Sequence, residues 1–210
     1  MNLICFSNNT AGGLLCDLLN GNRVQLEDYK TIGHAHSLMK IGDSPDIQTS
    51  IDHNEWNKRI GFYKNYTFWA GTHCHPIGIP DLSVFDQIIC ITTEHRQSKL
   101  LRWLRYFQGW YKHTHPDFQE NDSLETIDKI RELCKNVMIS YNAHPTCINV
   151  EFYKIVNGDF VRELGLSEKE FKKWQDKNHF LYTHSVNDWA VKRFNEAEYE
   201  VVNQTSFRYF

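Results

Sequence analysis

Short apolar runs of strand length alternate along this chain with segments whose leucines recur at helical spacing. Ile88 to Thr92 is an unbroken run of apolar and β-branched residues, which is typical of a strand covered on both faces. Leu3 to Phe6 is a similar run, and the leucines between Leu14 and Leu19 follow it at helical spacing. This alternation predicts an α/β fold, in the form of a three-layer α/β/α arrangement around a central, mostly parallel sheet.

The remaining patterns continue the alternation. Tyr66 to Gly71 and Cys147 to Phe152 are predicted strands, and Arg23 to Asp28 is a weaker candidate for an edge strand. A long helix is predicted from Glu94 to Tyr111, with Leu100, Leu101, Leu104 and Phe107 facing inward. Further helices are predicted over residues 52–63, 124–135, 167–176 and 187–195, the second of them after an N-cap at Ser123.

Composition and charge favour a single globular domain. With 210 residues, 41% of them hydrophobic, the chain is long enough for one domain with a sizeable core, residues 1–210. A formal net charge of −3 offers no basic footprint for nucleic acid. No run approaches the roughly 18 apolar residues of a membrane span. We therefore expect neither nucleic acid nor a membrane as a partner.

The cysteines indicate the compartment. The six cysteines are scattered along the chain, without a C-x-x-C pair, and most lie in apolar runs. This distribution is typical of reduced thiols in a core, and reduced thiols imply a reducing compartment. The sequence thus predicts a cytoplasmic location.

The segment between the first predicted strand and its helix is made of small and polar residues, Ser7 to Gly13. Small residues let backbone N–H groups approach an anion, and a helix N-terminus adds positive electrostatic potential. The segment lacks the lysine and the first glycine of the P-loop pattern G-x-x-x-x-G-K-S/T. It therefore predicts either an anion site or an ordinary strand-to-helix turn.

Eleven histidines are many for this length, and six of them form the HxH pairs His34/His36, His73/His75 and His113/His115. In an extended segment, residues i and i+2 point to the same side, so both imidazoles of a pair can reach one metal ion. A metal-dependent hydrolase that uses His73, His75 and another pair is therefore one hypothesis. Taken singly, a neutral His73 can act as a general base towards a substrate hydroxyl, with a structural histidine as the alternative.

Several segments in order resemble the sulfotransferases, a family within the P-loop nucleoside-triphosphatase superfamily. Phe6 to Leu15 resembles their strand–loop–helix of the P-K-x-G-T-T type, which holds the 5′-phosphosulfate of the donor. Thr72-His73-Cys74-His75-Pro76 resembles their K-T-H-x-P segment, whose histidine activates the acceptor hydroxyl. Asp86 to Ile91 and the helix after it resemble their 3′-phosphate-binding segment, and Ile148 to Phe152 resembles a late strand.

The resemblance implies a P-loop NTPase-like fold and a group transferase. Such an enzyme moves a sulfuryl group from 3′-phosphoadenosine 5′-phosphosulfate to a hydroxyl of a small-molecule acceptor. The resemblance assigns His73 as the catalytic base, Arg96 to the 3′-phosphate or the sulfate, and Asn9, Thr10, Ala11, Gly12 and Gly13 to the donor. In this alignment Asn9 stands where the family has lysine or arginine, and Gly12 and Gly13 stand where it has threonines.

These departures keep a third hypothesis open, namely a nucleotide- or phosphate-binding protein on the same fold without transferase activity. The transferase interpretation makes a geometric demand. The turn at residues 10–13 must open onto the same end of the sheet as the His73 imidazole, and the first strand must be central and parallel to its neighbours.

Overall fold

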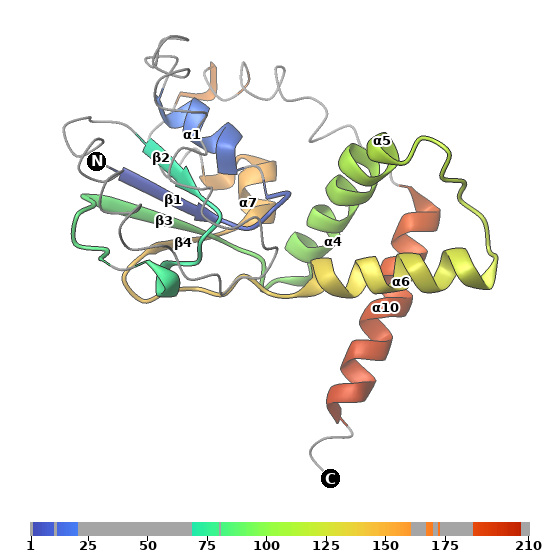
Figure 1. Ribbon diagram of the computed structural model, residues 1–210. Helices are drawn as coiled ribbons and strands as arrows, with labels where there is room; N and C mark the ends of the chain where they lie inside the picture. The colour runs from blue at the N-terminus through green and yellow to red at the C-terminus, as the bar shows by residue number, and fades with distance from the viewer. Residues whose placement is uncertain are drawn as a thin grey trace. The chain divides into compact units, whose positions relative to one another are not determined.

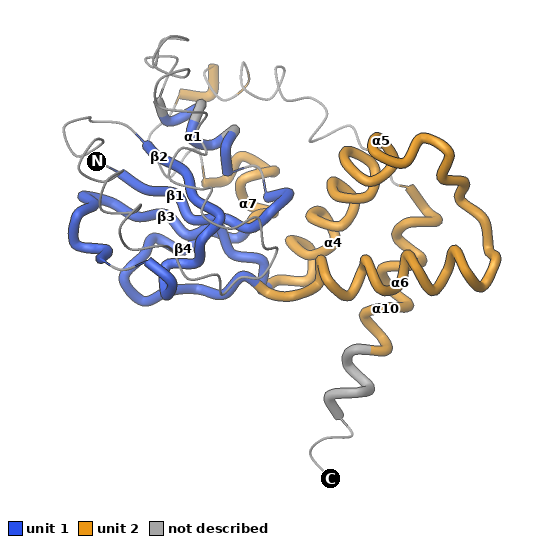
Figure 2. Tube along the Cα trace, in the orientation of Figure 1, with its two compact units in different colours: residues 1–94, 141–151 blue, residues 95–140, 152–210 orange. Residues whose placement is uncertain are grey.

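The computed structural model divides the chain into two compact units, which are coloured separately in Figure 2. Unit 1 comprises residues 1–94 and 141–151, and unit 2 comprises residues 95–140 and 152–210. The structure describes residues 2–10, 12–20, 69–79, 81–160, 167–169, 172 and 187–206. The predicted strand at 23–28, the predicted helix at 52–63 and most of the one at 167–176 lie outside these residues.

Unit 1 is built on a parallel sheet of four described strands (Figure 1). They are β1 (Asn2–Phe6), β2 (Trp69–Thr72), β3 (Gln87–Thr92) and β4 (Ile148–Glu151). Their order is β2-β1-β3-β4, and every pairing is parallel. The predicted α/β fold on a parallel sheet is thus confirmed, and so is the inner place of the first strand. The P-loop NTPase-like class and the full three-layer arrangement stay predictions.

The direction in which strands are added reverses at β1. The chain passes from β1 to β2 on one side, and β3 then lies on the other side of β1. In open α/β sheets, ligands bind beyond the carboxyl ends of the strands at such a switch point. The topology therefore favours a site at the carboxyl end of β1.

β1 is buried on both faces, as its apolar run predicts for an inner strand. Leu3, Ile4 and Cys5 have no exposed surface. Leu3 and Cys5 share one face and pack in a cluster with Ala70, Ile79, Phe85, Ile88, Cys90 and Tyr141. The helix α1 (Gly12–Asn20) packs against β1 and β2. The position of β1, and of the turn that follows it, is therefore set by core packing.

The chain leaves unit 1 after Glu94 and returns at Tyr141, and hydrogen bonds join these two crossings. The Tyr141 N–H donates to the Thr93 hydroxyl at 2.9 Å, and the Thr93 N–H donates to the Tyr141 carbonyl at 3.0 Å. Glu151, beside the last crossing, accepts from the Thr92 hydroxyl at 2.9 Å and from the Glu94 N–H at 3.1 Å. The residues at which the chain leaves and re-enters unit 1 are therefore hydrogen-bonded to one another at the carboxyl ends of β3 and β4.

Unit 2 is helical in its described part. Its helices are α4 (Arg96–Leu104), the π-helix η2 (Arg105–Tyr111), α5 (Lys112–Thr114), α6 (Leu124–Met138), α7 (Phe152–Asn157) and α10 (Asp188–Ser206). Ser123 caps α6 by accepting from the Thr126 N–H, which confirms the predicted N-cap. No described helix has the length and apolar character that a membrane span needs.

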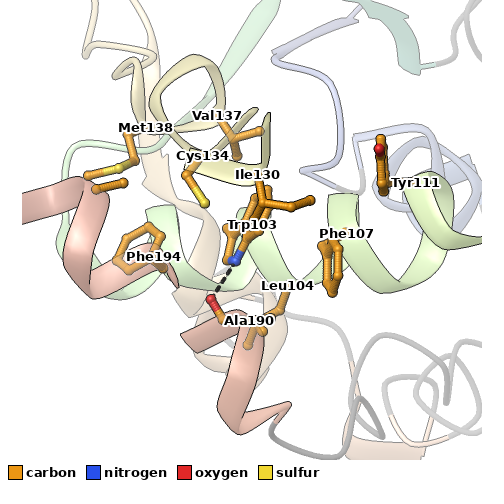
Figure 3. Close-up of a cluster of buried hydrophobic side chains, with 11 residues drawn as sticks. Trp103, Leu104, Phe107, Tyr111, Ile130, Cys134, Val137, Met138, Ala190 and Phe194 are labelled. Carbon is orange, nitrogen blue, oxygen red and sulfur yellow. Dashed lines mark hydrogen bonds between the residues drawn. The ribbon is translucent and has the colours of Figure 1, made fainter. Parts of the chain in front are cut away.

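The core of unit 2 gathers around one tryptophan, as Figure 3 shows. Trp103 is fully buried, and its indole N–H donates to the Ala190 carbonyl at 2.9 Å. Its ring stacks on Phe107 with the centroids 5.2 Å apart. The prediction that Leu104 and Phe107 face inward is confirmed, and Leu100 packs against the same cluster, whereas Leu101 is only partly buried. Trp103 can occupy the centre of this core because its ring packs on Phe107 and its N–H is hydrogen-bonded to the Ala190 carbonyl.

Candidate functional site

The turn between β1 and α1 is closed by two hydrogen bonds to one carbonyl. The Ser7 carbonyl accepts from the Thr10 hydroxyl at 2.6 Å and from the Thr10 N–H at 3.3 Å. Asn9 has a φ of 67°, in the left-handed region that asparagine adopts more readily than most residues. Ala11 lies outside the described residues. Asn9 and Thr10 thus shape a compact turn at the carboxyl end of the central strand.

Gly12 begins α1 in direct contact with Phe6. A Cβ atom added to Gly12 would overlap the Phe6 ring. Only glycine therefore lets the first turn of the helix approach β1 this closely. Gly13, the next residue, is partly exposed.

The Ser7 hydroxyl is a further feature of this turn. Ser7 is 4% exposed, and its Oγ has no hydrogen-bond partner among the described residues. Buried polar atoms are nearly always hydrogen-bonded, so an exception calls for an explanation. Its location at the switch point makes this hydroxyl a candidate ligand contact, which sequence reasoning did not single out.

His73 follows β2 directly and lies beside the end of β1. Cys5 is the register partner of Thr72, so the residues that follow each are neighbours. The rings of Phe6 and His73 are 4.7 Å apart between centroids. Phe6 therefore contacts both Gly12 and His73. The turn after β1 and the imidazole after β2 lie at the same end of the sheet, as the transferase interpretation demands.

His75 does not face a common ligand with His73. Its Nδ1 accepts from the Ile77 N–H at 3.2 Å and caps the short 3₁₀ helix η1 (Pro76–Gly78). The ring proton therefore lies on Nε2, which donates to the Asn142 carbonyl at 2.9 Å. With both nitrogens engaged, His75 has no lone pair left for a metal ion. This geometry argues against the hydrolase hypothesis.

The structure does not join either of the other histidine pairs to His73 and His75 in its described part. His34 and His36 lie outside the described residues, and the pair at 113 and 115 belongs to unit 2. Across the described ranges, no group of three or more His, Cys, Asp or Glu side chains could hold a metal ion.

Arg96 lies in unit 2, at the start of α4, and its guanidinium is engaged there. Its Nε donates to Glu198 at 2.7 Å, and its Nη2 donates to the Asn195 side-chain oxygen at 2.6 Å. Both partners belong to α10. A phosphate at Arg96 would compete with the Glu198 carboxylate for the guanidinium. The structure brings the turn after β1 and His73 together within unit 1, whereas the contacts of Arg96 are within unit 2.

Burial suppresses the reactivity of the cysteine thiols around the sheet. It raises the pKa of Cys74 to about 11, and it also raises the pKa of Cys5 and Cys90, because a thiolate is disfavoured away from water. None of the six cysteines, all of them among the described residues, forms a disulfide. The predicted reduced core thiols are confirmed at Cys5 and Cys90, which are fully buried. None of these three thiols is activated as a nucleophile.

Tyr141 was missed by sequence reasoning. Its hydroxyl donates to the Cys74 carbonyl at 2.8 Å, next to His73 and 67 positions away in the chain. No local pattern marks such a residue, because the contact arises only when the sheet has formed.

His144 makes unit 1 sensitive to pH. Partial burial and then the neighbouring His75, whose ring centroid lies 6.1 Å away, lower the pKa of His144 from its usual 6.5. The folded protein then binds a proton at His144 less readily than the unfolded chain does. The stability that this provides is complete above pH 6.5 and is lost as the pH falls towards the folded pKa.

We therefore expect the free energy of unfolding to decrease between pH 7 and pH 5. The His144→Gln variant should show a shallower decrease. Urea unfolding curves at half-unit pH steps measure both slopes, and equal slopes for the two proteins would contradict the prediction.

No family model, curated protein or solved structure matches this chain. Its candidate function therefore rests on the geometry of the site in unit 1.

Proposed function

We propose that unit 1 binds the phosphosulfate of a nucleotide donor, of the 3′-phosphoadenosine 5′-phosphosulfate type, at the turn between β1 and α1. The sulfuryl group then passes to a hydroxyl of a small acceptor, with His73 as the general base. The observation that carries the proposal is the contact of Phe6 with both Gly12 and His73. This contact supports the proposal, because the turn after β1 and the His73 imidazole lie at the same end of the sheet.

The turn offers hydrogen-bond donors to an anion. The first N–H groups of a helix have no partner within the helix and carry positive potential, and α1 has no acidic residue in its first turn. The Ser7 hydroxyl adds a donor without a competing partner among the described residues. Residues 7–13 contain no lysine or arginine, so these neutral groups must carry the interaction.

The transfer needs one base and a well-placed donor. The His73 imidazole accepts the proton of the acceptor hydroxyl as its oxygen bonds to sulfur. The bond from sulfur to the bridging oxygen breaks, and adenosine 3′,5′-bisphosphate leaves. Positioning of the reactants and stabilisation of charge on the bridging oxygen account for most of the acceleration in such reactions.

A second candidate function is nucleotide or phosphate binding without transfer. It is favoured by the uncharged turn and by the ion pair that occupies Arg96. A cytoplasmic location belongs to both proposals and is supported by the reduced state of the six cysteines.

Calorimetric titration with adenosine 3′,5′-bisphosphate tests donor binding. Ser7→Ala should weaken binding about tenfold or more, since a hydrogen bond to a charged group contributes about 1.5–3 kcal/mol. The same variant should leave thermal stability unchanged, because the Ser7 hydroxyl has no partner in the described protein.

The matched control is Ser83→Ala, an exposed serine of the same unit whose hydroxyl bonds Asp81. Equal affinities of Ser7→Ala and wild type, or no binding at millimolar nucleotide, would remove the proposed anion site. Binding without turnover would support the second candidate.

A further inference from the structure

The turn that carries His73 is fixed by hydrogen bonds to its backbone. The Cys74 N–H donates to the Thr72 hydroxyl at 3.1 Å, and the Cys74 carbonyl accepts from the Tyr141 hydroxyl at 2.8 Å. His73 is thus flanked on one side by β2 and on the other by a residue bonded at both its N–H and its carbonyl. The direction in which the His73 side chain leaves the backbone depends on these bonds.

Tyr141 is a rigid support because it is anchored at the end of β3. It exchanges two backbone hydrogen bonds with Thr93, and both residues have no exposed surface. Burial, and then the nearby Cys5 and Cys90, raises the pKa of Tyr141, so the phenol stays protonated and donates at neutral pH. Since β1 lies between β2 and β3, Tyr141 ties together the ends of the two strands that flank it.

His75 adds a second tie between the same two segments. Its Nε2 donates to the carbonyl of Asn142, the residue after Tyr141, at 2.9 Å. Its ring also packs edge-on against Tyr141, with the centroids 4.8 Å apart. Hydrogen bonds therefore join Cys74 and His75, the two residues after His73, to the segment Tyr141–Asn142.

We propose that Tyr141 is a positioning residue for His73: its buried hydroxyl holds the Cys74 carbonyl and thereby keeps the His73 ring against Phe6. The inference rests on the proposed function only for the chemical role of His73. The position of the His73 ring can be measured without any turnover. An experiment can therefore contradict the positioning by Tyr141 and leave the transferase proposal intact, or the reverse.

Tyr141→Phe tests the proposal, since it deletes the hydroxyl and keeps the ring. The readout is the pair of His73 ring-proton resonances in histidine-labelled protein, assigned by their absence in His73→Gln. With the Phe6 ring 4.7 Å away between centroids, its ring current should displace these resonances in the wild type, and the displacement should shrink in Tyr141→Phe. Unchanged His73 resonances would overturn the proposal.

The matched control is Tyr111→Phe. Tyr111 is also buried, at 3% exposure, but its hydroxyl has no partner among the described residues and it belongs to unit 2. Its substitution should leave the His73 resonances in place. An equal change in both variants would show a general effect of tyrosine removal and would also overturn the proposal.

Thr93→Val is a milder variant that keeps the inference testable if Tyr141→Phe does not fold. It removes the acceptor of the Tyr141 N–H and keeps both the phenol and the Thr93 N–H bond. It should shift the His73 resonances in the same direction by a smaller amount, and no shift would count against the proposal. Where transfer is detected, Tyr141→Phe should lower kcat with little change in donor KM, whereas a change in donor KM alone would contradict positioning.

Discussion

Replacing Trp103 with alanine should lower the free energy of unfolding of unit 2 by about 3–5 kcal/mol, the usual range for a buried tryptophan. Trp103 has no exposed surface, and it lies between α6 and α10 in the core of Figure 3. The truncation leaves a cavity and also removes the hydrogen bond to the Ala190 carbonyl. Because most domains are stable by only about 5–15 kcal/mol, this one change should abolish a large share of the total.

Urea unfolding followed by circular dichroism at the helical minimum measures this loss, since the described part of unit 2 is helical. The control is Trp110→Ala, which removes the same side chain from η2 at a position that is 49% exposed. Trp110→Ala should lower the free energy of unfolding by well under half as much as Trp103→Ala does. Trp103→Phe keeps a ring but not the N–H, so its loss of free energy should lie between the losses of these two variants. Similar losses for Trp103→Ala and Trp110→Ala would show that the cluster in Figure 3 does not hold the unit together.

The sheet could be predicted because its strands are buried on both faces. A strand in that environment needs apolar and β-branched residues throughout, and Leu3 to Phe6 and Ile88 to Thr92 display this directly. The order of the strands was not predicted from these runs. The transferase interpretation required β1 to be an inner strand parallel to its neighbours, and the pairing of β1 with β2 and β3 agrees with that.

The histidine pair shows where local pattern fails. The prediction that His73 and His75 point the same way assumed that the strand continues past Thr72. The chain instead turns there, because the Thr72 hydroxyl accepts from the Cys74 N–H, and His75 caps η1. When the side chain at the end of a strand accepts a hydrogen bond from the backbone two residues later, the chain turns and the following side chains change direction. A two-residue periodicity in the sequence does not reveal such a turn.

The helix after β3 was predicted in part. Leu104 and Phe107 lie in the core as leucine spacing predicted, and Leu100 packs against it, but Leu101 is only partly buried and the core centres on the aromatic residues Trp103, Phe107 and Tyr111. Those aromatic residues lie four apart, and the π-helical turn of η2 shifts the buried face along the segment. The partners that decide the outcome, such as the Ala190 carbonyl, are distant in sequence. Tyr141 escaped prediction for the same reason.

His73→Gln should lower the rate of sulfuryl transfer by about 10²- to 10⁴-fold, the usual contribution of a general base. Glutamine has a similar length and can still form hydrogen bonds, but it cannot take up the proton of the acceptor hydroxyl. In the proposed site the turn after β1 holds the donor, so the dissociation constant of the donor should stay close to that of the wild type. This combination, a large loss of kcat with intact donor binding, distinguishes a base from a residue that merely holds the site together.

The measurement is single-turnover transfer from labelled donor to a panel of small hydroxyl compounds, with nucleotide affinity from calorimetry on the same protein. His113→Gln is the matched control, because His113 is an exposed histidine of unit 2 with no place in the proposed chemistry. If His73→Gln turns over as fast as His113→Gln, the imidazole beside Phe6 is not the base. A loss of donor affinity as large as the loss of rate would instead make His73 part of the binding turn. The proposed turn contains no lysine or arginine to stabilise the leaving phosphate, so proton transfer to His73 should account for a larger part of the acceleration, which makes this distinction informative.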